Sequence, residues 1–152
     1  MEEIEALYQV YKDDVFRLAF SYTGQFADAE DVSQTVFLKL MDHYPKLTPG
    51  KEKHWLLKVA ANESRSILRR RRRLVQEEMP ELSFEDPQES HIFELVQALD
   101  QKYRAVVHLF YYEGYSTQEI GEILGIRRSC VTTRLNRARE MLKHEMEEET
   151  NA

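Results

Sequence analysis

Residues 116–139, STQEIGEILGIRRSCVTTRLNRAR, decide the fold of the C-terminal half of the chain. Ser116 and Glu119 fit a capping box, in which the serine hydroxyl accepts from the Glu119 amide and the glutamate reaches back to the serine amide. Gly125 is placed to supply the left-handed residue that ends this first short helix, and Ile126 can pack over the turn. A second helix follows. The pattern predicts a helix-turn-helix.

The apolar residues of this stretch fall on one face of each expected helix. They are Ile120, Ile123 and Leu124 on the first, and Val131, Leu135 and Ala138 on the second. Such a second helix can enter the major groove, where Arg suits guanine, Asn suits adenine, and Ser or Thr can bond bases or phosphates. The candidate DNA-binding residues are Arg127, Arg128, Ser129, Thr132, Thr133, Arg134, Asn136, Arg137 and Arg139. A plain helical hairpin with a solvated basic face is the alternative.

Arg127 and Arg128 fall at the start of this second helix, where the helix dipole disfavours positive charge. A nearby DNA phosphate would offset that cost. We therefore expect a tight phosphate or guanine contact at this point.

The N-terminal half shows three further helical stripes. Gly24 ends the first, and Asp28 is placed to cap the second by accepting backbone N–H groups. Residues 44–50 hold two prolines and a glycine and are expected to form a loop. A third helix begins its apolar stripe at Trp55, which we expect in the core, and ends in five arginines at 69–73. The sequence therefore predicts an all-α protein.

The chain is expected to form two small helical domains, residues 1–73 and 91–146. Between them, residues 74–90 contain two prolines and mostly acidic side chains without a sustained period, which is typical of a flexible linker. Residues 147–152 are expected to form an acidic tail.

The formal net charge is −6, but its distribution matters more than its sum. Residues 51–75 hold nine Lys or Arg against two acids, and residues 127–143 hold six against one. Between them, residues 76–100 hold eight acids and no Lys or Arg. Like charges repel unless anions surround them, so two basic blocks indicate two contacts with nucleic acid. Ordinary solvated helix faces are the simpler alternative.

Composition argues against several other classes of protein. The first residues lack a basic start followed by an apolar run, and no stretch approaches the roughly 20 apolar residues that span a bilayer. A single cysteine and five scattered histidines, without metal-ligand spacing, argue against a disulfide framework and a metal site. We expect a cytoplasmic protein that does not insert into the membrane, has no cofactor and is not an enzyme.

With these motifs placed, nearly the whole chain resembles the extracytoplasmic-function group of the sigma-70 superfamily, the bacterial RNA polymerase initiation factors. Residues 28–39, DAEDVSQTVFLK, resemble the region 2 helix that docks on the clamp helices of the polymerase β′ subunit. Residues 55–65, WLLKVAANESR, with the arginine run resemble the helix that reads the −10 element. Residues 115–139 resemble region 4, which reads the −35 element.

The resemblance implies roles for further residues. Asp31, Gln34, Thr35 and Lys39 would meet the polymerase core, which also contributes its β subunit. Asn62, Arg65, Ser66, Arg69 and Arg70, with the loop at residues 44–53, would hold the −10 strand, because an unpaired strand needs cations along its phosphates and a pocket for extruded bases. The expected partners are the polymerase core, promoter DNA and an anti-sigma factor.

Two other functions remain open at the level of sequence. One is an autonomous helix-turn-helix regulator, whose N-terminal helices would serve dimerisation or sensing. The other is a module that binds a polymerase subunit without reading DNA.

Overall fold

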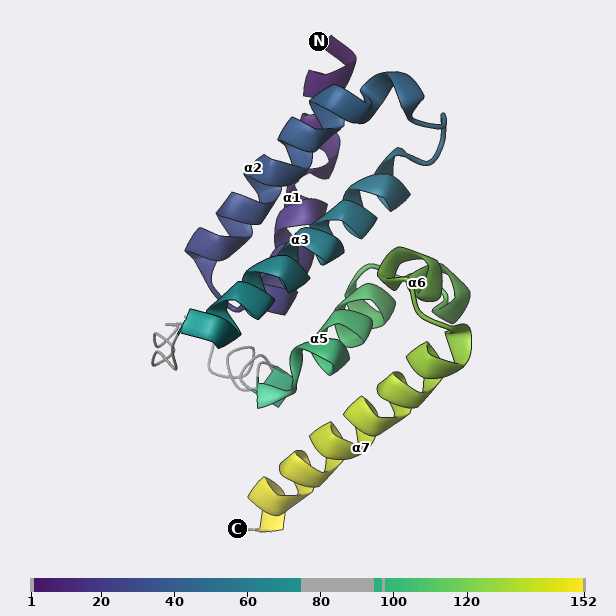
Figure 1. Cartoon of the computed structure of the whole chain (residues 1–152). Helices are drawn as coiled ribbons and strands as arrows, with labels where there is room; N and C mark the ends of the chain where they lie inside the picture. The colour runs from purple at the N-terminus through teal and green to yellow at the C-terminus, as the bar shows by residue number, and fades with distance from the viewer. Residues whose placement is uncertain (1, 75–94, 97, 152) are drawn as a thin grey trace. The chain divides into compact units, whose positions relative to one another are not determined.

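The computed structural model describes residues 2–74, 95, 96 and 98–151, and every regular element in these ranges is helical (Figure 1). The chain divides into two compact units, Met1–Glu77 and Glu78–Ala152. The predicted all-α architecture with two helical domains is confirmed. The predicted linker, residues 74–90, lies almost wholly outside the described residues.

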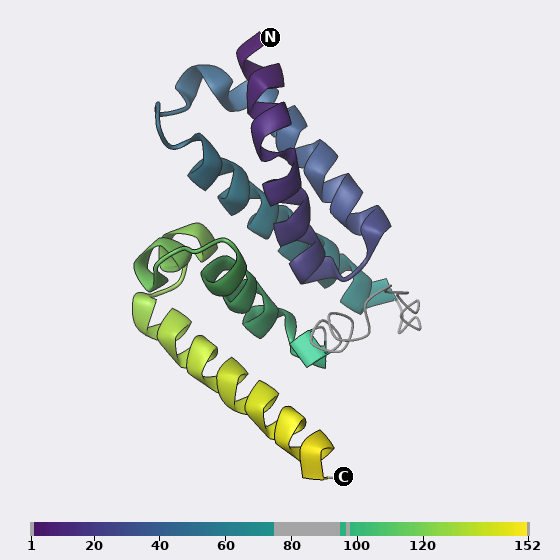
Figure 2. The same cartoon turned by 180° about the vertical axis from the view of Figure 1, so that it is seen from behind.

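The first unit is a bundle of α1 (Glu2–Thr23), α2 (Phe26–His43) and α3 (Glu52–Leu74), each in contact with the other two (Figure 2). Gly24 follows α1 with a φ of 67°, as expected of the residue that ends a helix. The core includes the predicted stripe of α2, and the most deeply buried side chains are Val15, Leu18, Val32, Val36, Leu40, Leu56 and Leu57. Residues 44–46 form a 3-10 turn, η1 (Tyr44–Lys46), rather than irregular loop.

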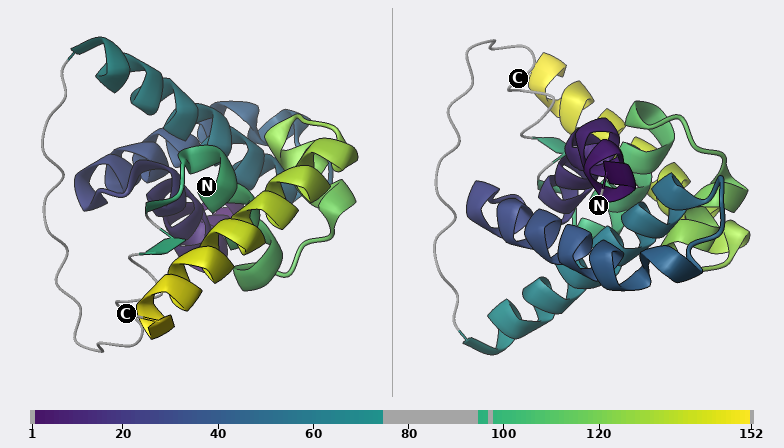
Figure 3. Two further views of the ribbon diagram at one scale, coloured as in Figure 1. Left: turned by 90° about the horizontal axis from the view of Figure 1, so that it is seen from below. Right: turned by 90° about the horizontal axis from the view of Figure 1, so that it is seen from above.

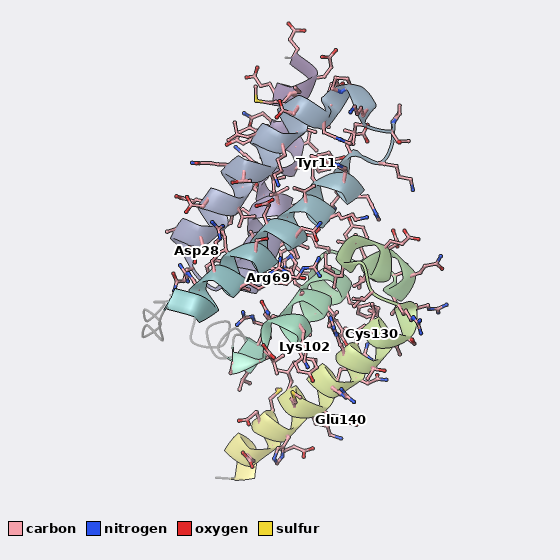
Figure 4. All side chains as sticks on the ribbon, viewed as in Figure 1. Tyr11, Asp28, Arg69, Lys102, Cys130 and Glu140 are labelled. Atoms are coloured by element: carbon pink, nitrogen blue, oxygen red, sulfur yellow. The ribbon has the colours of Figure 1, made fainter. Side chains whose placement is uncertain are left out.

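Asp28 does not cap α2, so that prediction is wrong. The helix begins two residues earlier, at Phe26, and its N-cap residue Gln25 makes no side-chain cap bond. Asp28, labelled in Figure 4, lies in the first turn of α2 and is only 8% exposed. It forms an ion pair with Arg71 near the end of α3. A partner 43 positions away along the chain outweighs the local preference for a cap.

The second unit comprises α5 (Gln101–Val107), η2 (His108–Tyr112), α6 (Thr117–Leu124) and α7 (Arg128–Asn151). Figure 3 shows α7 as one continuous helix. Leu99, Tyr103 and Ala138 form a buried cluster in which Val107 and Leu142 also pack. Arg104 is 6% exposed, and its burial lowers the pKa of the guanidinium, an effect that Asp100 partly offsets.

The segment η2 is a turn of π-helix, in which the Glu113 amide donates to the His108 carbonyl at 3.0 Å. Such i→i+5 turns are rare and occur mostly as single turns within helices. The turn carries Phe110 and Tyr111, whose rings meet edge to face at 5.0 Å. Gly114 then ends the segment with a φ of 75°.

The turn between α6 and α7 depends on a close approach at Gly121. A Cβ atom at this position would lie 2.7 Å from the Ile126 carbonyl oxygen and 3.5 Å from the Arg128 amide nitrogen. The Gly121 carbonyl also accepts the Ile126 amide at 2.9 Å. The two chain segments therefore touch at a point where only glycine fits.

We predict that Gly121→Ala destabilises the second unit by about 1–3 kcal/mol. Alanine in a helix interior normally gains up to about 1 kcal/mol over glycine, but here its methyl group meets a backbone carbonyl that cannot move without breaking the turn. Thermal unfolding of the full chain measures the effect. Glu122→Ala, at the exposed neighbouring position, is the control and should change stability little; equal melting of the Gly121 variant and the parent would contradict the prediction.

Candidate nucleic-acid interface

The predicted helix-turn-helix forms with its expected caps. The Ser116 hydroxyl accepts from the Glu119 amide at 3.1 Å, and a Glu119 carboxylate oxygen accepts from the Ser116 amide at 3.0 Å. Gly125 ends α6 in the left-handed conformation, with φ 71° and ψ 33°. The capping box and the glycine turn are therefore confirmed, and together they set where α7 begins.

The inner and outer faces of α7 also lie as predicted. Val131, Leu135 and Ala138 are at most 2% exposed, and all three predicted inward residues of α6 are buried. Arg134 is half-buried, whereas the other candidate DNA-binding residues are exposed: Arg127, Arg128, Ser129, Thr132, Thr133, Asn136, Arg137 and Arg139. One side of the helix thus presents a continuous polar and cationic surface, which we call the α7 face.

Positive charge gathers at the N-terminus of α7. The first turn contains no acidic residue, and Arg128 begins the helix with Arg127 just before it. Arg127 cannot cap the helix, because a guanidinium group only donates hydrogen bonds. The Arg128 Nε donates to the Thr117 hydroxyl at 3.0 Å, which holds this side chain against the start of α6. Two arginines beside the positive end of a helix dipole favour an anion at this point.

Two threonines on the α7 face have their hydroxyl protons engaged by the helix itself. Thr132 donates to the Arg128 carbonyl at 3.1 Å, and Thr133 donates to the Ser129 carbonyl at 2.9 Å. In this geometry each hydroxyl retains acceptor capacity but no free proton. They suit donors such as the amino groups of cytosine and adenine better than they suit phosphate oxygens.

At the far end of the α7 face, an arginine makes contacts within the protein. Arg139 is exposed, but its Nε donates to the Tyr111 hydroxyl on η2, and its Nη1 donates to the Asn136 Oδ1 at 3.0 Å. This Tyr111–Arg139–Asn136 arrangement could not be foreseen from the period of α7, because Tyr111 belongs to another element.

The second basic surface lies on α3. Asn62, Arg69 and Arg70 are exposed, and Arg65 and Ser66 are half-buried. They are linked in pairs along the helix: Arg65 donates to Asn62 at 2.6 Å and Arg69 donates to Ser66 at 3.3 Å. Ser66, Arg69 and Arg70 line one open pocket with Glu63. The structure therefore brings the predicted −10 residues onto one surface, which we call the α3 face.

A separate pocket of about 310 Å³ lies where the loop after α2 meets the start of α3. Its walls come from His43, Lys46, Leu47, Thr48, Lys51, His54, Trp55 and Lys58. Trp55 is half-buried rather than part of the closed core, and its ring stacks on His43 with centroids 4.7 Å apart and planes 7° from parallel. We call this the loop pocket; it combines an aromatic wall with three lysines.

The loop is predicted from the sequence, but the aromatic wall of the loop pocket is not. Trp55 begins an apolar stripe, which predicts a core position, and His43 is one of five scattered histidines without metal-ligand spacing. Only the fold of the 3-10 turn brings His43 to the side of Trp55. The clustering of Lys46, Lys51 and Lys58 around the loop was the available signal.

The residues predicted to meet the polymerase lie on α2, where Asp31, Gln34 and Lys39 are exposed and Thr35 is half-buried. Lys39 forms an ion pair with Glu63 on α3. Beside them lies an apolar pocket between α1 and α2, lined by Ile4, Glu5, Tyr8, Gln34, Phe37, Leu38 and Met41. Leu38 is 63% exposed, which the stripe analysis of α2 did not single out.

No group of three His, Cys, Asp or Glu side chains in residues 2–74, 95, 96 and 98–151 is placed to hold a metal ion. Within the same ranges, no helix has both the length and the apolar character needed to cross a bilayer.

Known proteins are similar to this chain in sequence. A family model described as Sigma-70 region 2 matches residues 7–74, and one described as Sigma-70, region 4 matches residues 92–142. The ECF RNA polymerase sigma factor SigL of Mycobacterium tuberculosis is 33% identical, with 95% of this chain and 89% of the relative covered. SigE of Mycolicibacterium smegmatis is 32% identical over 94% of this chain, which spans 61% of that relative. The chain belongs to the extracytoplasmic-function family of sigma-70 factors.

Solved structures share the fold. The sigma factor RpoE of Bartonella quintana, in complex with the anti-sigma factor NepR, has a TM-score of 0.81 at 20% identity, with 97% of this chain and 98% of that chain covered. CnrH, in complex with the cytosolic domain of CnrY, has a TM-score of 0.71 at 22% identity, with 95% and 87% covered. The resemblance drawn from the sequence is confirmed at the level of family and fold.

Loss of the capping box is expected to lower the stability of α6. Ser116→Ala removes the acceptor for the Glu119 amide and should cost about 1 kcal/mol, with a range of about 0.5–2. Denaturant unfolding of the full chain measures it. Gln118→Ala, in the same helical turn but outside the capping box, serves as the control, and an equal effect of the two substitutions would show that the box does not stabilise α6.

Proposed function

We propose that this sigma factor binds core RNA polymerase and directs promoter-specific initiation, with the α7 face on the −35 duplex and the α3 face and loop pocket on the −10 strand. The observation that carries the proposal is the pairing of two exposed basic surfaces on two separate helical units. A chain of net charge −6 repels DNA elsewhere, so contact is confined to these surfaces. The function requires no catalytic chemistry from this chain.

At the −35 element, the start of α7 supplies the reading residues, because the N-terminal part of a recognition helix meets the base edges. Arg128, held by Thr117, is placed for a guanine edge or a phosphate at the positive end of the helix dipole. Thr132 and Thr133 add acceptors for exocyclic amino groups. Arg137 follows one turn later and suits the phosphate backbone.

At the −10 element, the sigma factor must keep one DNA strand unpaired. The arginines of the α3 face can track phosphates, and the loop pocket can take a base out of the stack. The volume of this pocket, about 310 Å³, falls at the low end of the roughly 300–1,000 Å³ of small-ligand sites. The Trp55 ring can stack on the base, while Lys46 and Lys51 can contact the phosphates of the same strand.

Assembly with the polymerase uses the exposed residues of α2, Asp31, Gln34, Thr35 and Lys39, with the apolar pocket between α1 and α2 beside them. The polymerase core, through its β′ clamp helices and β subunit, is the proposed partner, which places the chain in the cytoplasm. An anti-sigma factor is proposed as the regulator, since the solved relative RpoE is held in a complex with one.

Run-off transcription from a randomised promoter library, with core polymerase and the full chain, tests the proposed function. Enrichment of templates with two conserved elements, and only when core enzyme is present, is the expected result. Tight binding of a palindrome by the chain alone would indicate an autonomous regulator. A tight complex with core enzyme that supports no transcription would indicate an interaction module.

Arg128→Ala should weaken binding of the polymerase complex to a selected promoter and make it less sensitive to salt. Each lost phosphate contact lowers the slope of log affinity against log salt by about 0.9, and a lost guanine contact costs about 1–3 kcal/mol. Lys143→Ala removes the same charge from an exposed position further along α7 and is the matched control. Unchanged affinity of the Arg128 variant would defeat its assignment.

Removing both Arg69 and Arg70 should slow promoter opening while leaving −35 binding intact. Two exposed phosphate contacts together are worth up to about 2 kcal/mol, so opening should fall by up to about thirtyfold. Permanganate reactivity of unpaired thymines around the −10 element reports opening directly. The double variant Lys102→Ala/Lys143→Ala removes two cations away from the proposed surfaces; equal opening by the two double variants would refute the role of the α3 face.

A further inference from the structure

Arg139 is held by protein groups on three sides. Its guanidinium carbon lies 5.6 Å from the centre of the Phe110 ring and 5.5 Å from that of Tyr111, both within range of a cation–π contact. Its Nε donates to the Tyr111 hydroxyl and its Nη1 to the Asn136 Oδ1. The π-turn η2 places the two rings in edge-to-face contact, and both rings lie next to this guanidinium.

The position of Arg139 along α7 also separates it from the residues that would read bases. It lies eleven residues after Arg128, which is about 16 Å along the helix axis. The major groove is only about 12 Å wide. A helix inserted by its N-terminal turns would therefore leave Arg139 beyond the base edges.

The contact with Arg139 fixes how Asn136 is presented. A guanidinium only donates, so the amide atom that faces it must be the oxygen, and the Asn136 NH₂ group points elsewhere. Paired contact with adenine requires the oxygen and the NH₂ of one asparagine to address the same base edge. With one lone pair of its oxygen engaged by Arg139, Asn136 keeps a second lone pair and two N–H donors, and the arginine sets the plane in which the amide presents them.

We propose that Arg139 is a positioning residue: Phe110 and Tyr111 hold its guanidinium so that it orients the amide of Asn136 toward one base edge. This inference rests on the proposed −35 role of the α7 face. It revises one expectation from the sequence, that Arg139 itself contacts DNA.

The test compares Arg139→Lys, Arg139→Ala and Tyr111→Phe as full chains in complex with core polymerase, on promoters selected by the parent chain. A lysine keeps the charge but cannot reach Tyr111 and Asn136 together. A positioning role predicts that all three variants lose −35 affinity by a similar factor, that the salt slope stays unchanged, and that base preference changes at one base pair. The double variant Tyr111→Phe/Arg139→Ala should lose no more than either single variant.

Arg137→Ala is the matched control, because its arginine lies on the same face with a proposed phosphate contact. This control should lower the salt slope by about 0.9 without changing base preference. The inference is overturned if Arg139→Lys behaves like the parent while Arg139→Ala lowers the slope, which is the signature of a phosphate contact. Unchanged base preference in every Arg139 variant would also overturn it.

Nuclear magnetic resonance of the free chain separates this inference from the proposed function. Tyr111→Phe should shift the Arg139 Nε–H resonance, and Arg139→Ala should shift the Asn136 side-chain amide. If the parent chain never transcribes from a −35 element, the proposed function fails even though these shifts appear. If it transcribes and the shifts are absent, the positioning role fails alone.

Discussion

The close approach of backbone at the turn between α6 and α7 is the constraint on which the reading surface depends. Gly121 leaves room for the Ile126 carbonyl, and the same glycine accepts the Ile126 amide, so α6 and α7 meet at one fixed angle. That angle turns Val131 and Leu135 into the core. Once the apolar stripe is buried, the opposite side of α7 has only solvent or a ligand to face.

The charge on that exposed side favours a bound anion. Arginine at the start of α7 opposes the helix dipole, and acidic residues near its end oppose it again. Neither arrangement stabilises the isolated helix, so packing within the unit offsets the cost, and we propose that a DNA phosphate does so at the N-terminus. The five arginines at 69–73 follow the same reasoning. Asp28 neutralises Arg71, whereas Arg69 and Arg70 stay exposed on the α3 face.

Local chemistry was enough to predict much of this structure. The capping box at Ser116, the left-handed Gly125 and the inward stripe of α7 depend on residues a few positions apart, so spacing alone reveals them. The same holds for the helical stripe of α2 and for the end of α1 at Gly24. The exposure of the candidate residues on the α7 face follows directly from that stripe.

The features that spacing could not reveal all involve partners far apart in the chain. Asp28 pairs with Arg71 rather than capping its own helix, and His43 meets Trp55 across the loop. The Tyr111 hydroxyl accepts a hydrogen bond from Arg139, 28 positions later in the chain. Gly121 is a similar case, because the sequence around a glycine in an amphipathic helix does not indicate that a backbone carbonyl packs closely against it. In each case tertiary packing decides between options that are locally equivalent.

Two basic surfaces on separate units can serve one promoter only if the polymerase holds them a fixed distance apart. Transcription from a selected promoter in which the spacer between the −35 and −10 elements is lengthened one base pair at a time measures this directly. We predict a sharp optimum, with activity lost when about half a helical turn of DNA is inserted, because the two elements then face opposite sides of the duplex. Activity that is indifferent to spacer length would contradict it.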